Sequence, residues 1–109
     1  MRRIIERTEV IAMEYLVGLG FDKEQVIPLI EQAKKDMESE LIRLDRLRKA
    51  DPVDPEALDR SLHALKGLLF NLGNHELAEK LEAIRHEGDP RQMVADLDRV
   101  LREAVRQAQ

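Results

Sequence analysis

The sequence has no cysteine and no tryptophan, and only one tyrosine and two phenylalanines. Without cysteine, the chain can form neither disulfide bonds nor thiolate metal sites, which fits a reducing compartment. With so few aromatic side chains, the core must be filled by Leu, Ile, Val, Ala and Met. A core of that composition is common in helix bundles.

A long apolar run and a basic surplus are also missing. No stretch approaches the ~18 apolar residues of a membrane span, and the pair Arg2 and Arg3 is not followed by the apolar core of a signal peptide. Acidic residues outnumber basic ones by 22 to 18, which gives a net charge of −4. Because phosphate binding usually needs a basic surface, we expect neither nucleic acid nor a membrane as the partner.

Nucleotide-binding and metal-binding motifs are absent as well. The sequence contains no Walker motif and no G-x-G-x-x-G, so we do not expect a complete kinase. His63, His75 and His86 lack the H-x-x-x-H or Glu-x-x-His spacing of a helical metal site. We interpret His75 and His86 as surface residues near helix ends, and we expect no metal or cofactor held by the chain itself.

The pattern that runs through the sequence is helical. Hydrophobic residues make up 43% and charged residues 37% of the 109 residues, which suits one globular domain. Apolar residues recur at spacings of three and four, and no strand pattern stands out. The breaks carry helix stop and start signals, namely glycines and capping aspartate, asparagine or proline residues. These signals are Gly18, Gly20, Asp22, Asp54-Pro55, Gly73-Asn74, Gly88 and Asp89-Pro90.

The breaks predict an all-α fold in a single domain over residues 1–109. A helix over 1–19 comes first and is expected to pack across one end. An up-down-up-down four-helix bundle over 22–107 follows, because short connections make neighbouring helices antiparallel. Such a bundle can bury its own apolar stripes, so we expect a monomer.

One face of the third predicted helix has an unusual composition. At ~100° per residue, five leucines fall within roughly 80° of one another and must face the core. They are Leu58, Leu62, Leu65, Leu69 and Leu72. His63 lies on the opposite side, toward solvent, with Lys66 and Gly67 beside it.

Gly67 is the informative residue of this face. A glycine inside an exposed helix costs about 1 kcal/mol relative to alanine, so it needs a reason. One reason is that it leaves space over the His63 imidazole for a reacting group from a second macromolecule; the alternative is close packing against another helix. Imidazole is a competent nucleophile near neutral pH, and Lys66, one turn away, could offset the charge of a phosphoryl group on the ring.

These residues resemble the signature of histidine-containing phosphotransfer (HPt) domains. His63-Ala64-Leu65-Lys66-Gly67, followed after five residues by Gly73, matches H-x-L-K-G-x-x-x-x-x-G. The continuation NLGNHELAEKLEAIRHEG is also similar to that family, and the resemblance covers about residues 21 to 107. Many members have small polar residues where Leu68 and Leu69 stand here, and there we expect altered packing rather than lost chemistry.

The resemblance implies a role for each motif residue. His63 would accept the phosphoryl group, Lys66 would stabilise it, Gly67 would keep the approach open, and Gly73 would end the helix. The chain would be a carrier and not an enzyme, exchanging phosphoryl groups with an aspartate on a response-regulator receiver domain that supplies its own Mg²⁺. A histidine kinase or hybrid kinase would stand upstream in a multistep phosphorelay of a two-component system, and we expect the chain to act in the cytoplasm.

Phe70 lies on the same outer face and is a candidate docking residue, although packing against a neighbouring helix is an equal alternative. Asp59, Arg60, Asn71 and Asn74 complete the candidate partner surface, and each is also typical of an ordinary surface or capping position. Two other functions stay open. One is an adaptor that binds a partner through the Phe70 face without phosphorylation, and the other is the HPt portion of a chemotaxis-type or hybrid histidine kinase.

Overall fold

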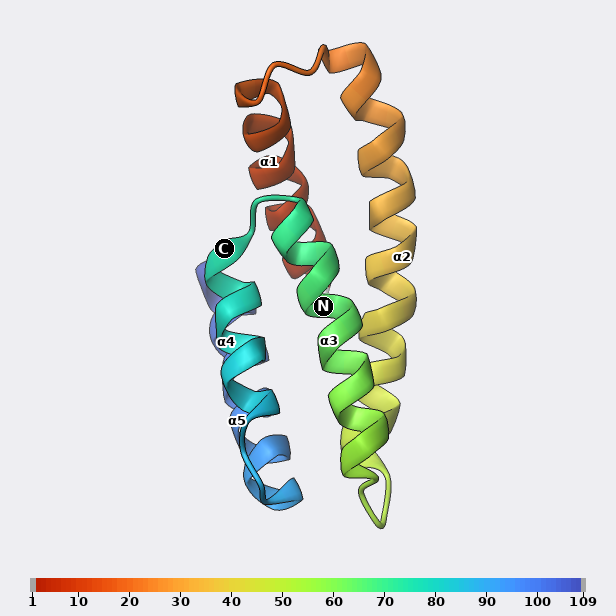
Figure 1. The fold of residues 1–109 in the computed structure, drawn as a ribbon, viewed down its shortest axis with the longest axis vertical. Coiled ribbons are helices and arrows are strands. Elements are labelled where there is room, and N and C mark those ends of the chain that lie inside the picture. The colour runs from red at the N-terminus through yellow and green to blue at the C-terminus, as the bar shows by residue number, and fades with distance from the viewer. Residues whose placement is uncertain (1, 109) are drawn as a thin grey trace.

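The structure, a computed structural model, describes residues 2–108. It is all-helical over these residues, as predicted, and the helices run along one long axis of about 45 Å (Figure 1). They are α1 (Arg2–Gly18), α2 (Lys23–Lys49), α3 (Pro55–Asn71), α4 (His75–Arg85) and α5 (Pro90–Gln107). None of these helices combines the length and the apolar character needed to cross a bilayer.

The helix starts follow the predicted caps. Asp54 accepts hydrogen bonds from the backbone N–H groups of Glu56 at 3.1 Å and Ala57 at 3.2 Å, and Asp89 accepts one from Arg91 at 3.0 Å. In both helices the residue after the aspartate is a proline, whose missing N–H would be unpaired there in any case. The Asp–Pro pairs therefore fix where α3 and α5 begin.

Gly73 ends α3 in a Schellman turn. Its N–H donates to the carbonyl of Phe70 at 3.0 Å, and the N–H of Asn74 donates to the carbonyl of Leu69 at 2.9 Å. The turn needs a left-handed residue, and Gly73 has a φ of +86°. A Cβ on Gly73 would also overlap the side chain of Tyr15, so both the backbone and the packing require glycine.

The predicted leucine stripe, which comprises four residues of α3 and its C-cap residue Leu72, forms the centre of the core. All five residues of the predicted stripe are buried, and they pack with apolar side chains from the other helices. The largest fully buried side chains among those are Val26, Met37, Leu41, Leu44, Leu81 and Leu97. Because this stripe must face inward, the opposite side of α3 must face solvent.

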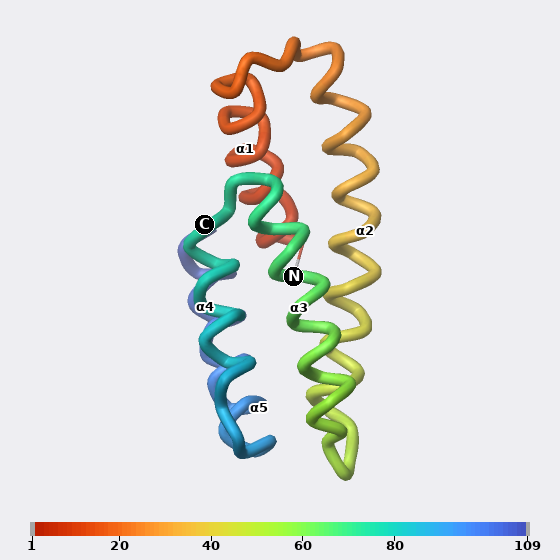
Figure 2. Tube along the Cα trace, viewed as in Figure 1, coloured from red at the N-terminus to blue at the C-terminus, as the bar shows by residue number. Residues whose placement is uncertain are grey.

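The first helix does not cross the end of the bundle as expected. It packs along α2, and the α1–α2 hairpin extends beyond the turn between α3 and α4 (Figures 1 and 2). A buried hydrogen bond of 3.0 Å from Asn74 Nδ2 to Thr8 Oγ1 ties the α3–α4 turn to α1. The same turn meets α1 again at Tyr15, so α1 holds the end of α3 in place.

Candidate functional site

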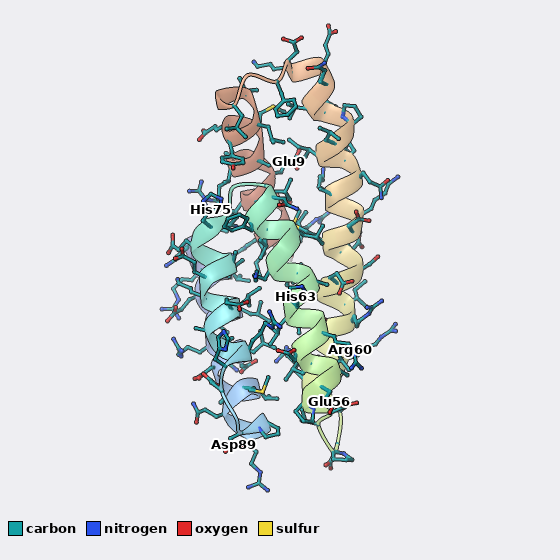
Figure 3. All side chains as sticks on the ribbon, viewed as in Figure 1. Glu9, Glu56, Arg60, His63, His75 and Asp89 are labelled. Atoms are coloured by element: carbon teal, nitrogen blue, oxygen red, sulfur yellow. The ribbon has the colours of Figure 1, made fainter. Side chains whose placement is uncertain are left out.

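His63 lies on the solvent side of α3. Its side chain is exposed, while Leu62 before it and Leu65 after it are buried. Figure 3 shows His63 on the same face of α3 as Glu56 and Arg60, at helical spacings. The orientation follows directly from the leucine stripe, as the sequence predicts.

Gly67 stands one turn after His63 and leaves open space. A Cβ built at this position would have no heavy atom within 4 Å apart from the local helix backbone. Close packing against another helix is therefore not the reason for this glycine. It sits inside α3 at the usual cost of a helical glycine, and it keeps the surface beside the imidazole clear.

Arg85, at the end of α4, is a site residue that the sequence analysis missed. Its Nη1 lies 2.9 Å from Nδ1 of His63. Its Nε donates to Asp59 Oδ1 at 2.8 Å, and its Nη1 donates to Glu82 Oε2 at 3.1 Å. Two carboxylates from two helices thus hold the guanidinium against the histidine ring.

Lys66 is paired with the same Glu82. The distance from Lys66 Nζ to Glu82 Oε2 is 3.3 Å, and Glu82 Oε1 lies 3.2 Å from Nε2 of His86. The Glu82 carboxylate therefore supplies the negative charge between the two cationic side chains Lys66 and Arg85. Any other anionic group brought beside Lys66 would compete with Glu82 for it.

Hydrogen bonding favours the ionised forms of these side chains. The hydrogen bond from Arg85 lowers the pKa of Asp59, against a smaller opposing effect of partial desolvation. Partial desolvation opposes ionisation of Glu82, but hydrogen bonds from Lys66 and Arg85 outweigh it and lower that pKa as well. The hydrogen bond to Asp59 raises the pKa of Arg85. Two carboxylates thus balance two cations beside His63.

Phe70 remains on the surface, with 52% of its area exposed. Its ring lies 4.6 Å from the ring of His75, which in turn meets Tyr15 edge to face at 5.5 Å. His75 is thus half-buried between two aromatic rings rather than free on the surface as expected, and its Nε2 is buried without a hydrogen-bond partner in the described chain. Phe70 combines partial packing on α4 with an exposed apolar surface.

The other candidate contact residues have different environments. Arg60 and Asn71 are exposed on α3, whereas Asp59 is half-buried and engaged by Arg85. Asn74 is buried: its Oδ1 accepts from the N–H of Leu77 at 3.4 Å, and its Nδ2 binds α1. Its side chain is committed to the fold and offers no surface to a partner.

A simple distance rule identifies Arg85 and Glu82. In an antiparallel helix pair, residues at equal distances from the turn lie at about the same height, so they can meet when both lie on the sides where the two helices pack. His63 and Arg85 each lie eleven residues from Asn74, and Lys66 and Glu82 each lie eight residues from it. Once the turn at Gly73 is recognised, both pairs could be predicted from the sequence.

Across residues 2–108, no group of three or more His, Asp or Glu side chains is arranged to hold a metal ion. No protein-family model matches the chain, and no curated protein or solved structure gives a significant match. Chemically, the site presents an exposed imidazole, a clear approach and a lysine one turn away, which suits exchange of an anionic group with a second macromolecule.

Proposed function

We propose that the chain is a histidine phosphocarrier of the HPt type, in which His63 receives a phosphoryl group from a receiver-domain aspartate and returns it. The observation that carries the proposal is the pairing of an exposed His63 with a glycine that has nothing near its missing side chain. A helical glycine that serves no packing purpose is best explained by the space that a partner needs.

The proposed transfer needs little from the chain itself. A lone pair on His63 Nε2 forms the N–P bond, and the aspartyl P–O bond breaks with its electron pair returning to the aspartate. Lys66 would exchange its contact with Glu82 for one with the phosphoryl oxygens. Mg²⁺ and the acidic pocket would come from the receiver, so the chain acts as a carrier without kinase activity of its own.

The wider assignments belong to the same proposal. We assign α2–α5 to an up-down-up-down four-helix bundle and α1 to an additional N-terminal helix. We place the chain in a cytoplasmic two-component phosphorelay as a monomer, with a histidine kinase or hybrid kinase upstream. The chain fits equally a free carrier or the HPt portion of a chemotaxis-type or hybrid kinase.

The proposed receiver-docking surface surrounds His63 on α3. Arg60 stands one turn before the histidine, and Phe70 and Asn71 stand two turns after it, all exposed. An exposed phenylalanine on an otherwise polar helix face is a suitable anchor for an apolar partner surface. Asn74 is excluded from this surface because it is buried.

Phosphotransfer from a panel of phosphorylated receiver domains tests the proposal. We expect at least one receiver to label the chain with an acid-labile phosphate, and we expect His63→Gln to abolish the label. His86→Gln is the matched control, because His86 is also exposed and also borders Glu82. Labelling that persists in His63→Gln, or no labelling by any receiver, would contradict the assignment.

An adaptor function is the second candidate, and the exposure of Phe70 is the observation that favours it. An adaptor would bind its partner through this apolar surface whatever the state of His63. Affinity that is unchanged in His63→Ala but lost in Phe70→Ala, in a chain that accepts no phosphate, would select the adaptor. A phosphocarrier requires His63 for its activity even where Phe70 supplies most of the affinity.

A further inference from the structure

The contact between Arg85 and His63 determines which ring nitrogen of His63 carries the proton. A guanidinium has five N–H donors and no acceptor, so Nδ1 of His63 must accept the hydrogen bond from Arg85 Nη1. A neutral imidazole has one donor and one acceptor nitrogen. With Nδ1 as the acceptor, the proton lies on Nε2, the other ring nitrogen.

Arg85 is firmly held in this position. Its side chain is only 22% exposed, and it binds both Asp59 oxygens, at 2.8 and 3.4 Å, in addition to Glu82. Charge-assisted contacts of this kind are stronger than neutral hydrogen bonds. These contacts hold the guanidinium in the orientation in which Nη1 is directed at Nδ1 of His63.

We propose that Arg85 is a positioning residue that holds His63 in the tautomer with a protonated Nε2. The consequence for phosphoryl transfer rests on the proposed function. A protonated Nε2 has no lone pair in the ring plane, so it cannot attack phosphorus. Arg85 must leave Nδ1 before the outward nitrogen becomes a nucleophile.

The reactive state then follows from the same geometry. When Arg85 withdraws, the proton can reside on Nδ1 and the lone pair on Nε2. The lone pair forms the N–P bond, the phosphoryl donor's bond to phosphorus breaks with its electron pair, and the proton stays on Nδ1. Asp59 and Glu82 can stay bound to the guanidinium during this step. Its withdrawal therefore breaks the hydrogen bond to His63 and leaves both ion pairs intact.

Nitrogen-15 NMR of the histidine rings tests the tautomer without any partner. The spectrum is recorded at about pH 8.5, where imidazole is neutral, and the His63 signals are assigned by their loss in His63→Gln. We expect a protonated Nε2 in the wild-type chain. In Arg85→Met the ratio of the Nε2–H to the Nδ1–H tautomer should fall about tenfold, because a charged hydrogen bond to Nδ1 is lost.

Two further variants keep this test decisive. Arg60→Met removes an exposed arginine one turn from His63 and should leave the ratio unchanged. Asp59→Asn loosens Arg85 while keeping its charge, and should shift the ratio in the same direction even if Arg85→Met does not fold. A wild-type ring protonated on Nδ1, or a ratio that neither Arg85→Met nor Asp59→Asn changes, overturns the proposal.

Labelling by phosphoramidate, a small phosphoryl donor that releases ammonia, separates this inference from the proposed function. We expect His63 to be labelled about tenfold faster in Arg85→Met than in the wild type, in proportion to the tautomer shift. Slower labelling in the variant overturns the restraining role of Arg85. A shifted tautomer with no label at His63 in either protein supports the Arg85 contact and counts against the phosphocarrier.

Discussion

Replacement of Gly67 by alanine should stabilise the fold. The added Cβ has no heavy atom within 4 Å to overlap, and the position lies inside α3. Alanine in a helix interior is favoured over glycine by about 0.5–1 kcal/mol, so the free energy of unfolding should rise by about that amount. For a domain of this size, the melting temperature should increase by about 2–4 °C.

The assay combines urea unfolding, followed by circular dichroism, with receiver phosphotransfer on the same preparations. A larger residue, in Gly67→Leu, should keep the fold and slow transfer to His63, because its side chain fills the approach that the glycine leaves open. A lower free energy of unfolding in Gly67→Ala would refute the inference that Gly67 faces open space. Normal transfer in Gly67→Leu would refute the steric explanation of the glycine.

Gly73 supplies the matched control for this experiment. It has a φ of +86°, and a Cβ there would overlap Tyr15. Gly73→Ala should therefore destabilise the protein by about 2 kcal/mol or more, through backbone strain and overpacking. Two glycines six residues apart should thus respond to the same substitution with opposite signs.

The remaining predictions concern the cap of α4 and two carboxylates. Asn74→Ala should lower the free energy of unfolding by about 1–2 kcal/mol in urea titrations, because the cap of α4 and a buried hydrogen bond to Thr8 are both lost. If the cap accounts for most of this loss, Asn74→Asp should lower the free energy of unfolding by a smaller amount. The hydrogen bond from Arg85 lowers the pKa of Asp59, so the ionised carboxylate stabilises the fold above about pH 4, and this stabilisation is lost as the pH falls through the lowered pKa. Asp59→Asn should therefore make the free energy of unfolding less sensitive to acid. An unchanged dependence of that free energy on pH would contradict this. A hydrogen bond shared with Asp96 raises the pKa of Glu87, so the protonated Glu87 side chain stabilises the fold at acidic pH, and this stabilisation is lost as the pH rises. Glu87→Gln should therefore have a higher free energy of unfolding than the wild type at pH 7 but not at about pH 4. The same difference in free energy at both pH values would refute this.

The features that the sequence predicts correctly are local in origin. Asp54 and Asp89 each precede a proline, and their caps form at the predicted positions. The leucine stripe of α3 is equally local, because helical pitch alone places its residues on one side and His63 on the other. Exposure of the histidine and space at Gly67 follow from that periodicity.

The features that escaped prediction depend on how helices pair. Arg85 reaches His63, and Glu82 reaches Lys66, only because the turn at Gly73 sets α3 and α4 side by side in one register. The cap function of Asn74 is visible in the sequence, but its bond to Thr8 is not, since that bond depends on where α1 lies. Contacts between residues far apart in the chain carry no signal in apolar periodicity.

The function itself depends on whether one imidazole can carry phosphate. Mapping the modified residue by mass spectrometry, after exposure to phosphorylated receivers and without acid treatment, addresses this most directly. We predict a single phosphate on the peptide that contains His63. A phosphate on His75, His86 or an acidic residue, or a chain that stays unmodified with every receiver, would contradict the account.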